Sequence, residues 1–270
     1  MCCWAGVSVS GFYAWRRTVA QAKKFDACFD VHVKRVFDAS NGTYGYRRVH
    51  EQLKLDNIES TERGVQRSMA RQRLKSCHPA PWRYATQQGR GKRPADLIGQ
   101  NFTASRPGVR LVGDITQIDT WEGPLYLSTM IDLFNSEIVG YSFADNHHTD
   151  LICETVLMAV RNGRVRRRGV FHSDQGSEYT SKQFEKCLKA NRMRGSMGRV
   201  ATCYDNALAE SFFASLKKEL VHRTVFPTRK HAIKAIVNYI EVWYNCQRLH
   251  SAHEYRTPVE VRESFKKIAA

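Results

Sequence analysis

The sequence predicts a small all-helical domain followed by an α/β domain. Two observations lead to this expectation. Apolar residues change from helical spacing to short apolar runs after Pro107, and a polar, basic, glycine-bearing segment lies between the two patterns. We therefore expect a helical domain over residues 1–79, a linker over 80–107, a core domain over 108–225 and a helical extension of that core over 226–270.

The helical domain is predicted to contain three helices, at residues 21–37, 44–54 and 61–75. The polar turn between the last two is typical of helix-turn-helix units. The final predicted helix repeats a cation every fourth residue, at Arg63, Arg67, Arg71 and Lys75. Such a stripe suits the phosphate backbone of DNA, and an ordinary solvated helix face explains it equally well.

The core domain begins with three apolar runs, at residues 111–118, 125–133 and 138–143, which predict three consecutive strands. The predicted elements that follow are a helix (150–161), a strand (169–173), a helix (181–190), a strand (193–197) and a helix that contains Glu210. This order is that of an RNase H-like α/β domain with a five-stranded mixed sheet, although periodicity alone does not choose that fold. Near the end of the chain, residues with helical spacing predict core packing: Ile233, Val237, Ile240 and Tyr244.

The charge favours a polyanionic partner such as nucleic acid. The formal net charge is +16, and residues 1–110 carry 20 Lys and Arg against 8 Asp and Glu. Eight cysteines without a Cys-x-x-Cys pair favour reduced thiols, and a zinc site built from Cys28, His32, Cys77 and His78 lacks the usual spacing. The sequence has no long apolar stretch and no signal peptide, so we expect a cytoplasmic protein without membrane contact.

Three acidic residues stand where this fold would bring them together. Asp114 lies inside the first strand, Asp174 ends the fourth strand where Gly176 permits a sharp turn, and Glu210 lies on the following helix, which Asp205 is predicted to cap. Three carboxylates suit a pair of magnesium ions, which stabilise the anionic oxygens of phosphodiester chemistry. The rival acids are Asp119, Asp132, Glu178 and Asp205, of which Glu178 is a candidate for a supporting role and Asp205 for a structural one.

Longer motifs surround two of these acids. Residues 174–179 read Asp-Gln-Gly-Ser-Glu-Tyr, residues 204–213 read Tyr-Asp-Asn-Ala-Leu-Ala-Glu-Ser-Phe-Phe, and 35 residues separate Asp174 from Glu210. With further motifs at 9–15, 44–49 and 244–258, the sequence resembles the OrfB-type transposases of the IS-three family of insertion sequences, relatives of retroviral integrases. The resemblance covers almost the whole chain.

The resemblance implies a DDE transposase that nicks element ends and joins the released 3′-hydroxyl to another phosphodiester. It assigns Asp114, Asp174 and Glu210 as catalytic metal ligands for Mg²⁺, which Mn²⁺ can replace. It also implies DNA contacts by Lys217 and by the helical domain, to which we add Arg63, Arg67, Arg71 and Arg248 as candidates. The expected partners are double-stranded DNA, both terminal inverted repeats and target, further copies of the chain on that DNA, and an OrfA-type protein from an upstream frame.

The sequence departs from the family pattern at Leu111, Ala201 and His253-Glu254, where the family has Trp, Gly and Leu-Gly. These departures leave open a decayed transposase that binds DNA as a repressor. An RNase H-type nuclease that acts on RNA–DNA hybrids is a further alternative, but it does not explain the basic leading domain.

Overall fold

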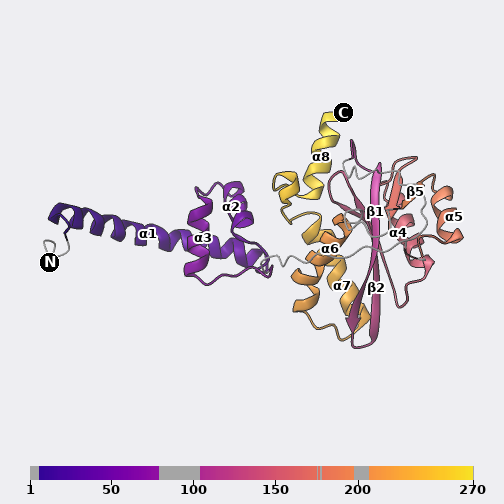
Figure 1. Cartoon of the computed structure of the whole chain (residues 1–270), viewed down its shortest axis with the longest axis horizontal. Coiled ribbons are helices and arrows are strands. Elements are labelled where there is room, and N and C mark those ends of the chain that lie inside the picture. The colour runs from indigo at the N-terminus through magenta and orange to yellow at the C-terminus, as the bar shows by residue number, and fades with distance from the viewer. Residues whose placement is uncertain (1–5, 79–103, 175, 177, 198–206, 270) are drawn as a thin grey trace. The chain divides into compact units, whose positions relative to one another are not determined.

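Three helices form the N-terminal unit of the computed structural model (Figure 1): α1 (Val9–Ala39), α2 (Tyr46–Leu55) and α3 (Glu62–Arg71). The structure describes residues 6–78, 104–174, 176, 178–197 and 207–269, and for residues 20–26 and 269 it describes the backbone alone. Contacts divide the chain into two units, Met1–Pro81 and Trp82–Ala270. Most of the predicted linker lies outside the described residues.

The helices of this unit begin at side-chain caps and pack through a small core. The Ser8 hydroxyl accepts a hydrogen bond from the Gly11 amide, and the Thr61 hydroxyl accepts one from the Gly64 amide, so each satisfies a free N–H at a helix start. The first helix starts well before the predicted residue 21. The buried apolar side chains of the unit are Phe29, Val33, Val36, Phe37, Tyr44, Val49, Leu53, Val65 and Met69.

The predicted end of the third helix was wrong. Helix α3 ends at Arg71, and Arg73 adopts a left-handed backbone with φ 55° while the Leu74 amide donates to the Met69 carbonyl. This turn closes the helix because the left-handed residue directs the chain away from the helix axis. Lys75 therefore does not belong to the cationic stripe.

The second unit is built on one five-stranded sheet with the order β3-β2-β1-β4-β5. The strands β1, β4 and β5 are parallel, and β2 is antiparallel to both β1 and β3. The prediction of a five-stranded mixed sheet is confirmed. The strands are β1 (Arg110–Thr120), β2 (Gly123–Asp132), β3 (Ile138–Ala144), β4 (Val170–Ser173) and β5 (Arg194–Met197).

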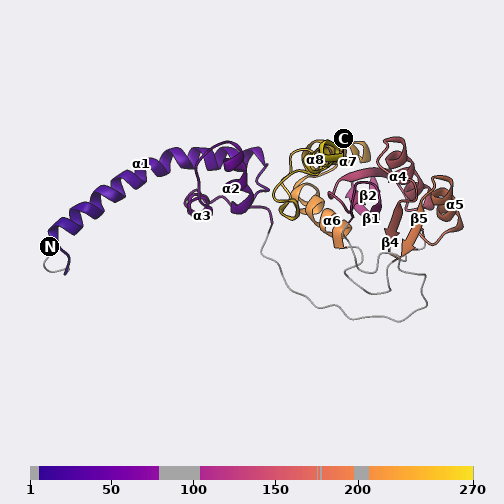
Figure 2. The same ribbon diagram turned by 90° about the horizontal axis from the view of Figure 1, so that it is seen from above.

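Helices cover both faces of this sheet (Figure 2). One face packs against α6 (Ala207–Glu219), α7 (Arg229–Asn238) and the π-helical turn Tyr239–Tyr244, and the other against α4 (Thr149–Arg161) and α5 (Lys182–Ala190). Short 3-10 turns (Val221–Arg223 and Ser251–His253) and α8 (Pro258–Ala269) complete the described elements. Among the described residues, every helix is too short or too polar to cross a membrane.

The C-terminal segment belongs to the core, as its helical spacing predicted. Ile240 and Tyr244 are buried in the cluster on the α6 face, and Ile233 packs against it, whereas Val237, also predicted as core, is half-buried and is not a member of this cluster. The sequence did not predict the change from α-helix to π-helix at Tyr239, because both periods place the same apolar residues inward over a single turn. This segment holds α6 against the sheet.

Strand β1 crosses the centre of the sheet, and its alternation decides which residues meet α6. Val112 and Ile118 lie in the cluster with α6, whereas Leu111 lies in the cluster with α4 and α5. Side chains of a strand point alternately to opposite faces, so Asp114 shares the α6 face with Val112. Gly113 takes the other face, where a Cβ atom would lie 2.2 Å from Cζ of Phe171.

We expect Gly113→Ala to destabilise the second unit by about 1–3 kcal/mol, because the ring of Phe171 is buried and cannot move aside without disturbing Tyr179 and Phe184. Urea unfolding measures this loss. Gly195→Ala on β5 is the matched control, since its Cβ would meet only a terminal methyl of Leu188 at 3.3 Å. Equal stability of the two variants would contradict this account.

Candidate active site

Asp114 is placed by the middle of β1 on the sheet face that α6 covers. Its carboxylate accepts a hydrogen bond from the Ile115 amide at 2.8 Å, and its cross-strand neighbour on β2 is Thr129. The side chain is partly buried, unlike those of Asp174 and Glu210, which are exposed. A carboxylate in the centre of a sheet loses much of its hydration, and this cost requires compensation from nearby groups.

Asp174 directly follows β4, the strand that pairs in parallel with β1. The chain turns there as predicted, and the Gly176 amide donates to Oδ1 of Asp174 at 3.1 Å. A Cβ at Gly176 would lie 3.2 Å from this oxygen and 3.1 Å from Oε2 of Glu178. The turn therefore brings two carboxylates to the same glycine, at the end of the strand beside Asp114.

Glu210 and Lys217 both lie on α6. Glu210 is in the first turn, and two turns later Lys217 is half-buried. The helix is fixed by Phe212 and Leu216, which are almost fully buried against the sheet. The residues proposed to cap this helix, Asp205 and its neighbours, lie outside the described residues.

Electrostatics shows that these groups act on one another. The pKa of Asp114 rises from 3.8 to about 7, chiefly because burial penalises its charged form. The negative charges of Asp174 and Glu210 raise the pKa further, while the Ile115 amide and the Lys217 ammonium lower it. The three predicted acids and Lys217 thus share one local field, with Asp114 at its centre.

The donor set fits magnesium, which prefers carboxylate oxygens, and it offers no soft ligand that would favour zinc. A divalent cation near Asp114 would offset the repulsion that raises its pKa. The acids do not already form a closed cage, since within the described parts of the chain no three His, Cys, Asp or Glu side chains are close enough to hold a metal. The described Cys28, His32, Cys77 and His78 likewise form no group that could hold zinc.

The structure adds two residues at this site for which the sequence gave little signal. The Tyr179 hydroxyl and the Thr129 hydroxyl are buried and form no hydrogen bond with the described residues. Thr129 is the register partner of Asp114, and Tyr179 is close enough that Asp114, Asp174 and Glu178 raise its pKa, after burial itself. Tyr179 stands in the quoted motif, but only strand register could reveal Thr129.

The rival acids have other partners. Asp132 is buried and accepts hydrogen bonds from the amides of Gly108 at 2.7 Å and Phe134 at 2.9 Å. It therefore fixes the segment before β1 and the segment after β2. Burial raises its pKa to about 6. Asp119 accepts from the Gln117 side chain in an exposed position. Glu178 faces His147, with Oε1 3.6 Å from Nε2.

The candidate DNA contacts of the helical unit differ in their availability. Arg63 and Arg67 are exposed on α3. Arg71 also lies at the surface, but its guanidinium donates to both carboxylate oxygens of Asp30 at 2.7 and 2.9 Å. That ion pair joins α3 to α1, so Arg71 has a structural partner within its own unit.

Arg248, a predicted DNA contact, is buried and paired within the second unit. It is 5% exposed, and its guanidinium donates to Glu219 at 2.8–3.1 Å and to the Ser215 hydroxyl at 3.3 Å. Glu219 also accepts from the Tyr239 hydroxyl and the Trp243 ring N–H. This network ties the end of α6 to the C-terminal segment, and leaves Arg248 no surface on which to meet a phosphate.

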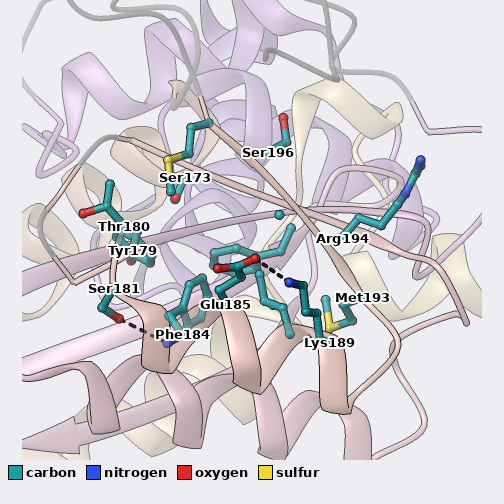
Figure 3. A pocket seen from close by; sticks show the side chains of 14 residues that line it. Ser173, Tyr179, Thr180, Ser181, Phe184, Glu185, Lys189, Met193, Arg194 and Ser196 are labelled. Carbon is teal, nitrogen blue, oxygen red and sulfur yellow. Dashed lines mark hydrogen bonds and ion pairs between the residues drawn. The ribbon is translucent and has the colours of Figure 1, made fainter. Parts of the chain in front are cut away.

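A cavity of about 500 Å³ lies between α5 and the strands β4 and β5 (Figure 3). Ser173 and Tyr179 line it near Asp174, and Phe184 and Met193 line its apolar part. None of the three predicted acids lines this cavity. Its rim is ordered by local pairs, such as Lys189 with Glu185 at 2.5 Å.

Comparison with known proteins gives three family matches. Integrase core domain models match residues 104–203 and 210–264, and an HTH-like domain model matches residues 26–80. Transposase InsF for insertion sequence IS3A of Escherichia coli (strain K12) is 34% identical over 255 residues, which cover 93% of this chain and 88% of that protein.

Two further proteins illustrate the range of similarity. The transposase for insertion sequence element IS904 of Lactococcus lactis is 34% identical over 230 residues, with 84% of this chain and 90% of that protein covered. Among solved structures, the HTLV-2 integrase catalytic core domain in complex with magnesium is 16% identical, with a TM-score of 0.44. The match covers 58% of this chain and 98% of that chain.

The raised pKa of Asp114 predicts how the metal-free protein responds to pH. The folded chain keeps this proton up to a pH of about 7, whereas the unfolded chain releases it near 3.8. The folded state therefore binds more protons between these values, and stability falls as pH rises from about 4 to about 7. Asp114→Asn should be more stable than wild type at pH 8, by at most about 4 kcal/mol, and equally stable at pH 4. Urea unfolding in a chelator tests this, and parallel pH curves would exclude it.

The buried ion pair predicts a large stability loss without a change in DNA binding. Arg248→Met leaves Glu219 charged and buried, so we expect a loss of about 3–5 kcal/mol on unfolding. Adding Glu219→Gln should recover part of it, because the amide oxygen still accepts from Tyr239 and Trp243. If the single variant were stable but bound DNA with a lower salt dependence, Arg248 would be a DNA contact after all.

Proposed function

Because the chain belongs to the family of insertion-sequence transposases that includes InsF, we propose that Asp114, Asp174 and Glu210 are its catalytic residues and that they act with magnesium. The observation that supports this assignment is the field around Asp114, whose pKa is raised chiefly by burial and then further by the other two carboxylates. Asp114 lies within β1, Asp174 directly follows β4, and Glu210 lies in the first turn of α6.

Magnesium bound there would supply positive charge to the attacking and leaving oxygens of a phosphodiester. The fold holds each of the three carboxylates in place. Asp114 is fixed by β1 and by its hydrogen bond from Ile115, Asp174 by the Gly176 turn, and Glu210 by the buried face of α6. Manganese, which also accepts oxygen ligands, is expected to replace magnesium.

Lys217 is proposed to contact DNA close to the reacting phosphodiester. It is half-buried on the same helix as Glu210, and its positive charge lowers the pKa of Asp114. Arg63 and Arg67 are proposed as backbone contacts of the helical unit, since both are exposed on α3. We retain Arg71 as a weaker candidate because Asp30 already binds its guanidinium.

The proposed substrates are the terminal inverted repeats of an element and a target duplex. Joining two element ends to one target requires more than one active site, so we propose that several copies of the chain assemble on DNA. An upstream-frame protein of the OrfA type is proposed as a further partner, and the nucleoid as the place of action. These proposals rest on the family and on the positive charge of the chain.

We expect Glu210→Gln to reduce joining of element ends by at least roughly a hundredfold, because the amide keeps the shape but loses the charge that holds a cation. Gel analysis of labelled end duplexes with MgCl₂ measures the joined product. Glu185→Gln is the matched control, since Glu185 is exposed on α5 and forms an ion pair with Lys189 of the same helix.

The same experiment separates the alternative functions. Equal joining by the Glu210 and Glu185 variants would overturn the assignment of Glu210. Cleavage of an RNA–DNA hybrid without any joining would instead identify a nuclease. End binding by the wild type without product under Mg²⁺ or Mn²⁺, and with the upstream-frame protein present, would identify a DNA-binding repressor.

A further inference from the structure

The end of the sheet opposite Asp174 carries a group of unpaired cations. The turn between α4 and β4 and the turn between α5 and β5 meet there, at the N-terminal ends of the parallel strands β4 and β5. Five arginines on these turns and strand starts are exposed and form no ion pair with a described residue, whereas a sixth, Arg164, is half-buried and lies 3.7 Å from Glu137. This arginine end consists of Arg166, Arg167, Arg168, Arg192 and Arg194.

Backbone hydrogen bonds hold the two turns together. The Arg168 amide donates to the Arg192 carbonyl at 2.8 Å, and the Arg194 amide donates to the Gly169 carbonyl at 2.9 Å. The Arg166 amide donates to the Gly108 carbonyl at 2.9 Å, which ties the same turn to the segment before β1. The cations are therefore presented from a fixed backbone, although they come from two distant parts of the sequence.

The backbone of two of these arginines is unfavourable for their residue type. Arg168 has φ 66° and Arg192 has φ 56°, in the left-handed region where glycine is preferred. Helix α4 places Gly163 at the corresponding position after its last turn, with φ 65°, whereas α5 places Arg192 there. Folding alone would favour glycine at both sites, so the retained charge needs another explanation.

The surroundings leave this positive charge uncompensated. The nearby carboxylate of Glu137 is buried and already bonded to Arg164 and Arg262. The two turns themselves contain no aromatic residue on which an unpaired base could stack. A rigid cluster of exposed arginines that form no ion pair with the described residues suits the phosphates of a duplex.

We propose that the arginine end is a second DNA site on the catalytic unit, which holds the backbone of a duplex at the end of the sheet remote from the acids. Its binding is independent of base sequence and of metal, because it involves guanidinium groups and phosphates only. The site adds to the contacts proposed for α3 and Lys217, and it does not depend on the assignment of the three acids.

The test uses the full chain with Arg168→Gly and Arg192→Gly together. Glycine suits both backbone conformations, so the double variant should fold as the wild type does, which a urea unfolding curve checks. Fluorescence anisotropy with a random-sequence duplex, without metal, between 50 and 200 mM KCl gives the affinity and its salt slope. We expect the slope to fall by about 2 and the affinity near 100 mM KCl to fall by roughly ten- to a hundredfold.

The matched control is Lys230→Gln with Lys234→Gln, two exposed lysines of α7. Their helix starts beside the β1–β2 hairpin, where the Arg229 amide donates to Glu122, so the same charge is lost far from the arginine end. Equal slopes for the two double variants would overturn the proposal, as would tighter binding of a single strand than of the duplex. The joining assay of the Glu210 variant needs divalent metal, whereas this binding assay contains none, so failure of the catalytic assignment and failure of this site are distinguishable.

Discussion

The structure of the second unit depends on keeping a carboxylate inside a sheet. Asp114 lies on a central strand where burial opposes its charge, and the other two acids make that charge still more costly. Such a site persists only if the surrounding elements are stable enough to hold it. The clusters on both faces of the sheet, the ring of Phe171 over Gly113 and the network that anchors the end of α6 supply this stability. The packing of these elements offsets the free-energy cost of the buried carboxylate.

Much of this arrangement was predictable because strands and helices have fixed periods. Apolar runs located the first three strands, the last two were also expected near their observed positions, and alternation along β1 places Asp114 on the same face as Val112. Gly176 signalled the turn after Asp174. The contacts that depend on register or on distant partners were not predictable, such as Thr129 opposite Asp114 and the hydroxyl of Tyr179 among three carboxylates.

Arg248 shows why a cation in a sequence is ambiguous. It stands in a polar segment beside His250, where a surface role is the ordinary expectation, yet Glu219 lies 29 positions earlier and the fold joins the two. Glu254 stands where the family pattern has glycine. Its φ of 55° is a left-handed backbone conformation that favours glycine, so this departure from the pattern affects the backbone. Leu111, another departure, is fully buried and packs normally.

The placement of charge along β4 gives the catalytic unit an electrical polarity. Arginines gather at the start of this strand and carboxylates at its end, so these two groups of charges form a local dipole roughly parallel to the strand. A polyanion attracts the arginine pole and repels the acidic pole. Divalent ions on the acids would weaken that repulsion.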